Sequence, residues 1–135
     1  MVDRGVLLGD VITGTGVLHL ALGVVMFQEP LRGMLGDGLV DSVGAFVDRD
    51  NALWFLVSGG FLLTSGLTVR WLKKVHGVVP TPLGWGLVVI SVLGAAVEPL
   101  SGFWLVLVEG VLLVRSGRDQ RAPGSMTEVA GVRAR

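Results

Sequence analysis

The sequence of 135 residues has no cysteine and only two histidines, and charged residues make up 16% of it. Without cysteine the chain forms no disulfide and offers no thiolate ligand or nucleophile. Two histidines without a His-x-x-x-His pair leave too few ligands for a zinc site. The formal net charge is zero, so no positive field favours nucleic acid. We therefore expect no metal, no cofactor and no nucleic-acid partner.

Apolar residues, in contrast, are abundant and gathered into long runs. Hydrophobic residues make up 51% of the chain and the mean hydropathy is +0.71. About 20 helical residues cross a hydrocarbon core of about 30 Å, and 21 glycines without a fixed period fit close helix packing in lipid. We predict an all-α polytopic membrane protein, a four-transmembrane-helix bundle formed by residues 1–115. Its spans lie at about 6–27, 52–72, 83–97 and 100–115.

The segments between the spans carry the turn and charge signals. Glu29 and Pro30 are expected to end the first span, and Asp50 or Asn51 to cap the second. Between them, apolar residues recur at helical spacing opposite aspartates, which predicts a short amphipathic helix in the first extracytoplasmic connector; the apolar set is Leu35, Leu39, Val43, Phe46 and Val47. Residues 116–135 mix charge with Gly, Pro and Ser and are expected to form a flexible cytoplasmic tail.

Lysine and arginine positions predict the orientation. Basic residues lie in the turn of residues 70–74 and at the start of the tail, whereas the first connector is acidic. By the positive-inside rule the protein is a multi-pass plasma-membrane protein with both termini in the cytoplasm. The same count places Asp10 about 6 Å above the inner boundary, level with Arg70 or Arg115. We predict a structural ion pair there.

Glu109 is the most unusual residue of the pattern, because it lies in the middle of an apolar span. An ionisable group at membrane depth is costly, so it is a functional-site hypothesis by default. Counting from the span ends, Glu109 lies about 13 Å below the outer boundary, and His19 and Ser58 about 10 Å below it. We therefore predict that three helices bring these side chains to a common depth.

The helical phase of each span predicts that further residues line a pocket around His19, Ser58 and Glu109. Each span offers a stripe of small and polar residues, and we expect these stripes to face one another; on the first and fourth spans they are Thr15, Gly16, His19, Gly23, and Ser101, Gly102, Leu105, Glu109, Leu112. The glycine pairs Gly59-Gly60 and Gly84-x-Gly86 are read as packing features. His19, Glu109 and Glu98 are the candidate catalytic residues, and the candidate substrate-binding residues are Asn51, Trp54, Ser58 and Trp104.

Burial favours the uncharged forms of a carboxyl group and an imidazole, so Glu109 and His19 form an acid and base of matched strength. This chemistry suits cofactor-independent isomerisation, cyclisation or epoxide hydrolysis of an apolar small molecule. Two alternatives stay open. In the first, the protein is a small proton-coupled transporter that uses Glu109 and can form homo-oligomers. In the second, His19 and Glu109 form a hydrogen bond with each other that only holds the helices together. Apart from the small molecule, membrane lipids are the expected partners.

Two sequence patterns carry a family resemblance. The first-span TGVLHLALG and second-span ALWFLVSGGFLL resemble a group of uncharacterised small four-helix integral membrane proteins of bacteria, with the resemblance covering most of residues 5–115. The chain is rich in Val, Gly, Leu, Arg and Ala, which are common in proteins encoded by GC-rich genomes, and this suggests an actinobacterial source. The resemblance implies a four-helix membrane fold and no established activity.

Overall fold

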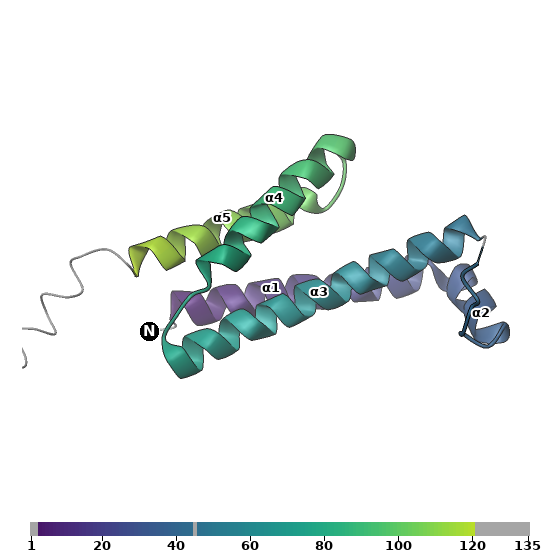
Figure 1. The fold of residues 1–135 in the computed structure, drawn as a ribbon, viewed down its shortest axis with the longest axis horizontal. Helices are drawn as coiled ribbons and strands as arrows, with labels where there is room; N and C mark the ends of the chain where they lie inside the picture. The colour runs from purple at the N-terminus through teal and green to yellow at the C-terminus, as the bar shows by residue number, and fades with distance from the viewer. Residues whose placement is uncertain (1–2, 45, 121–135) are drawn as a thin grey trace, which may run out of the picture. The chain divides into compact units, whose positions relative to one another are not determined.

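The computed structural model describes residues 3–44 and 46–120, which form five helices and no strand. In chain order they are α1 (Arg4–Met26), α2 (Gln28–Gly36), α3 (Val47–His76), α4 (Thr81–Val97) and α5 (Phe103–Asp119) (Figure 1). The all-α class is thus confirmed. α1 and α3 are long and apolar enough to cross a membrane by length and composition, and α4 is a shorter apolar helix.

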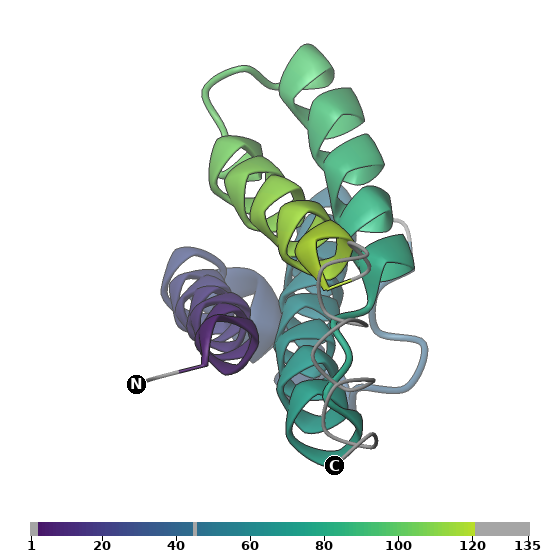
Figure 2. The ribbon, with the colours of Figure 1, turned by 90° about the vertical axis from the view of Figure 1, so that its left-hand side faces the viewer.

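The chain divides into two compact units. The α1/α3 unit comprises Ile12–Leu67, and the α4/α5 unit comprises Met1–Val11 and Thr68–Arg135. In the first unit the body of α1 lies against α3, with α2 and the following turns at one end. In the second, α4 and α5 pair along their length (Figure 2).

Glycines let the helices approach in both units. A Cβ at Gly16 would lie 2.4 Å from the backbone nitrogen of Leu63, so α1 contacts the α3 backbone there. In the α4/α5 pair, a Cβ at Gly84 would lie 2.9 Å from the backbone nitrogen of Val114. The predicted packing role is confirmed for Gly59 and Gly84. Gly60 and Gly86, by contrast, have no such neighbour among the described residues.

The predicted end of the first span at about residue 27 agrees with the structure, but the stop signal assigned to Glu29 and Pro30 is wrong. α1 ends at Met26, and both residues lie in the first turn of α2. A proline is tolerated there because the first backbone N–H groups of a helix have no partner within it. A short helix, α2, does follow the first span, but of the five apolar residues that predicted an amphipathic helix only Leu35 lies in it.

The connector after α2 is irregular rather than helical. Gly38 has a φ of +95° and ends α2 in a Schellman motif, in which the Leu39 N–H donates to the Met34 carbonyl at 2.9 Å. Leu39 and Asp41 also have positive φ, at 64° and 58°. A continuous helix through these positions is therefore excluded, although the spacing of apolar residues favoured one.

Helix α3 is longer at both ends than expected. It begins at Val47, so Asp50 and Asn51 lie inside the helix and neither caps it. Acidic residues in a first turn and basic residues in a last turn both stabilise a helix through its dipole, and α3 has Asp48 and Asp50 at one end and Lys73, Lys74 and His76 at the other. Gly77, with φ +67°, follows the last helical residue. The residues expected to form a basic turn thus extend the helix.

Candidate functional site

The candidate residues fall into both units. The α1/α3 unit holds His19, Asn51, Trp54 and Ser58, and the α4/α5 unit holds Glu98, Trp104 and Glu109. The pairing of His19 with Glu109 stays a prediction.

His19 is fixed between α1 and α3 by three contacts. Its ring stacks on the Phe55 ring at 3.9 Å between centroids and 11° between planes. Its Nε2 lies 3.1 Å from the Phe55 carbonyl oxygen and 3.2 Å from Ser58 Oγ. A carbonyl only accepts, so the first contact assigns the proton to Nε2. Nδ1 is then the ring nitrogen of neutral His19 that can take up a proton.

Ser58 completes this arrangement from one turn further along α3. Its hydroxyl donates to the same Phe55 carbonyl at 2.8 Å, which leaves an oxygen lone pair facing His19 Nε2. A Cβ at Gly59 would lie 3.0 Å from the His19 Cδ2 atom, so the ring packs directly over this glycine. The structure thus brings together His19 and Ser58, as their depth predicted.

Asn51 and Trp54 lie on α3 before this cluster and are exposed, Trp54 by 62%. The Asn51 side chain makes no hydrogen bond within residues 3–44 and 46–120. Neither residue is among the His19 contacts described above. Their substrate-binding role therefore stays a prediction without local support.

Glu109 lies within α5 and is 2% exposed, although it is the one acidic residue between Phe103 and Arg118. The next residue, Gly110, contacts α4: its Cβ would lie 3.0 Å from the Gly84 carbonyl oxygen and from Leu87 Cβ. On α4, Ser91 is fully buried, and its hydroxyl has no hydrogen-bond partner among the described residues. The α4/α5 unit therefore buries polar groups within apolar helices.

The phase predicted for α5 is wrong by one residue. Leu105 and Leu112 were expected to face inward with Glu109, but they are 48% and 43% exposed. Leu113 and Val114 are buried instead. Packing follows the small residues Gly110 and Gly117, because a glycine lets the α4 backbone or side chains come closest.

Glu98 caps the end of α4, and Trp104 is the second residue of α5, so the two lie on either side of the turn between these helices. Glu98 is exposed, and its backbone carbonyl accepts a hydrogen bond from Ser101 Oγ at 2.6 Å. The Trp104 indole N–H donates to the Pro99 carbonyl at 2.8 Å. These contacts fasten the turn, and they use the Glu98 backbone rather than its carboxylate.

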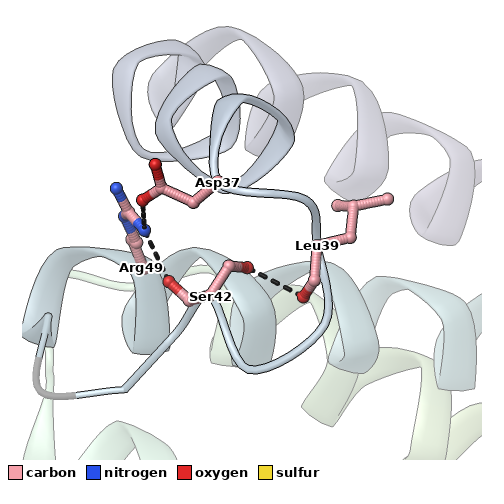
Figure 3. A network of polar contacts seen from close by, with 4 residues as sticks. All are labelled: Asp37, Leu39, Ser42 and Arg49. Carbon is pink, nitrogen blue, oxygen red and sulfur yellow. Dashed lines mark hydrogen bonds and ion pairs between the residues drawn. The ribbon is translucent and has the colours of Figure 1, made fainter.

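Arg49 is a residue that sequence reasoning missed. Its side chain is 12% exposed, and its guanidinium pairs with Asp37 at 2.7 Å and donates to the Ser42 carbonyl (Figure 3). It also lies 4.3 Å from the centroid of the Phe46 ring. The available signal was an arginine placed between Asp48 and Asp50 in a connector that is acidic overall. Arg49 holds the turns that follow α2 against the start of α3.

The side chains do not assemble a metal site in the part of the chain that the structure describes. No three His, Asp or Glu side chains of those residues gather closely enough to hold an ion.

Comparison with known proteins identifies a family without an established activity. The family described as "Family of unknown function (DUF6463)" matches residues 4–120, a range that includes all five helices. Neither the curated proteins nor the solved structures gave a match. The chain belongs to the DUF6463 family.

Proposed function

We propose that this protein is a multi-pass plasma-membrane protein in which α1, α3, α4 and α5 each cross the bilayer, with both termini in the cytoplasm. The observation that carries the proposal is an inverted distribution of polarity. Phe61 and Leu93 are 69% and 64% exposed, whereas Ser91 and Glu109 are 0% and 2% exposed. Large exposed apolar surfaces mark membrane or partner contacts, and lipid is the partner that would cover several helices at once.

The lengths of the helices are compatible with four crossings. α4 and α5 have 17 residues each, or about 25 Å at 1.5 Å per residue. A span slightly shorter than the hydrocarbon core is accommodated by local thinning of the bilayer at modest cost. α1 and α3, with 23 and 30 residues, are long enough without such thinning.

Within this domain we assign Glu109 as the proton-handling group of a polar pocket for an apolar small molecule. Its support is its burial in an apolar helix, since an intramembrane carboxyl is expected to have a function. In a double-bond isomerisation, the Glu109 carboxyl group would give one proton to the substrate, and the resulting carboxylate would take one proton from it. The protein then ends the reaction with the protonation state in which it began.

Carbodiimide labelling of membranes tests the assignment of Glu109. Dicyclohexylcarbodiimide is apolar and reacts with protonated carboxyl groups that it reaches from lipid, whereas a charged carbodiimide reacts from water. We expect the apolar reagent to modify Glu109, as located by peptide mass spectrometry, and the charged reagent to spare it. Glu109→Gln removes the modified peptide. Glu98→Gln, which changes an exposed glutamate of the same unit, leaves it in place.

Two results would reject the assignment. One is the absence of modification at Glu109 while the protein is folded and Glu98 reacts. The other is equal modification by both reagents, since this would place Glu109 in contact with water. If Glu109→Gln lowers only the melting temperature and the native protein is not modified, the residue has a structural role.

A further inference from the structure

A second feature of the α4/α5 unit lies away from Glu109. The first residues of α1, the last turns of α3 and the end of α5 surround an open depression of about 520 Å³. Its charged side chains are Asp3, Arg4, Lys73 and Asp119.

Two of these charges already have partners. The Lys73 ammonium lies 3.4 Å from the Asp3 carboxylate and donates to the Gly77 carbonyl at 3.3 Å. Arg4 and Asp119, in contrast, form no ion pair with any residue that the structure describes. The depression therefore presents one cation and one anion that are not neutralised within its walls.

The walls are held by packing and by a hydrogen bond. A Cβ at Gly5 would lie 2.9 Å from Lys73 Cγ and 3.0 Å from Val79 Cγ2, so α1 packs closely here. The Gln120 side chain accepts a hydrogen bond from the Val79 backbone N–H at 3.1 Å. Arg4 and Asp119 thus extend from backbone segments with fixed neighbours.

Exposed tryptophans indicate what surrounds this end of the unit. Trp71, in the last turns of α3, is 56% exposed, and Trp85, near the start of α4, is 47% exposed. Arg118 lies 5.6 Å from the centroid of the Trp85 ring. Tryptophan with arginine is typical of the level of lipid headgroups.

We propose that the depression binds the phosphoethanolamine headgroup of a membrane lipid. Arg4 binds the phosphate, for which a guanidinium offers two parallel N–H groups, and Asp119 binds the ammonium. Ser116, a further lining residue, supplies a hydroxyl within the same depression. The proposal rests on the membrane placement above and is independent of the role of Glu109.

The balance of charge favours this headgroup over an anionic one. The lining contains two acidic and two basic side chains, so it creates no net positive field. A headgroup with a phosphate but no cation would leave Asp119 without a partner and bring a second negative charge toward it. The depression thus offers one cation and one anion to a zwitterionic headgroup.

Native mass spectrometry of the full-length protein in detergent tests this proposal. The probes are phosphatidylethanolamine, phosphatidylglycerol and phosphatidylcholine of the same acyl chains, together with inorganic phosphate and free phosphoethanolamine. We expect selective retention of phosphatidylethanolamine. Arg4→Gln should weaken its binding about tenfold, the effect of one hydrogen bond to a charged group. Asp119→Asn should remove the preference over phosphatidylglycerol. Lys74→Gln, a neighbouring charge change outside the lining, should change neither.

The other outcomes contradict either the headgroup site itself or the identification of its ligand as a lipid. Equal retention of the three lipids, or unchanged retention in both Arg4→Gln and Asp119→Asn, contradicts a specific headgroup site. Binding of inorganic phosphate or free phosphoethanolamine as tight as that of the lipid assigns the site to a soluble ligand. Circular dichroism confirms the fold of each variant. Because Glu109 is unchanged throughout, failure here leaves the carbodiimide result unaffected.

Discussion

The guanidinium group of Arg70 pairs with the carboxylate of Asp10, 60 residues earlier in the chain. The close approach of the two helices explains the contact, since a Cβ at Gly9 would lie 2.7 Å from the Arg70 backbone nitrogen. Both side chains remain partly exposed, at 44% and 41%. The pair joins the beginning of α1 to the last part of α3.

Disruption of this pair should have a modest effect on stability. For partly exposed charges we expect a coupling of about 0.5–1 kcal/mol between Asp10→Asn and Arg70→Gln. The measurement is a double-mutant cycle of thermal unfolding in detergent. A coupling free energy of zero would mean that the ion pair adds nothing to the stability of the folded protein beyond what the two hydrated charges would give.

The small size of Gly16 should be required, whereas that of Gly14 should not. Gly16→Ala places a Cβ 2.4 Å from the α3 backbone, and overpacking of this kind costs about 1–3 kcal/mol. Gly14 has open space around it, so Gly14→Ala should be neutral or stabilise the helix by up to about 1 kcal/mol. Thermal unfolding of the two variants checks both signs. Equal melting temperatures would contradict the close contact of α1 with α3.

Asp3 should contribute to stability in a pH-dependent way. The Gly5 backbone N–H donates to the Asp3 carboxylate at 2.8 Å and, with the charge of Lys73, holds the pKa of Asp3 below 3.8, although desolvation opposes the shift. A lowered pKa in the folded protein gives stability above the unfolded pKa, which is lost as pH falls through the folded pKa. Asp3→Asn should therefore reduce the fall in melting temperature below about pH 3.8. If the melting temperature of the variant falls at low pH just as that of the native protein does, Asp3 does not contribute to the pH dependence of stability.

The proposed topology predicts which loops lie on the same side of the membrane. Because the chain lacks cysteine, single cysteines can be introduced without a background signal. In intact cells, a membrane-impermeant maleimide should label Val40→Cys and Leu100→Cys, whereas Val78→Cys should react only after lysis. Labelling of Val40→Cys and Leu100→Cys from opposite sides would exclude four crossings.

The sequence predicted the parts of the fold that depend on long-range periodicity and charge. The all-α class follows from the length of the apolar runs. The count of depth placed Asp10 level with Arg70 or Arg115, and in the structure Asp10 pairs with Arg70. The contact of His19 with Ser58 follows from the same count. These features depend on distances along helices, which are regular.

Local details were less predictable, because they depend on individual contacts. Pro30 lies in a first helical turn, where its missing N–H costs nothing, so the proline signal did not mark an end. The phase of α5 was missed because Gly110 and Gly117, rather than Leu105 and Leu112, face α4. Arg49 contacts Asp37 and Ser42, which lie 12 and 7 residues earlier in an irregular segment, and no spacing rule describes such a cluster.

The most direct test of the inverted polarity compares two neighbouring positions on α4. Leu93 is 64% exposed and Ser91 is fully buried. In membranes, a lipid-soluble maleimide should label Leu93→Cys much faster than Ser91→Cys, and a water-soluble maleimide should label neither. If the water-soluble reagent instead labels Leu93→Cys as fast as it labels Val40→Cys in the exposed connector, then α4 faces water and the membrane account is wrong.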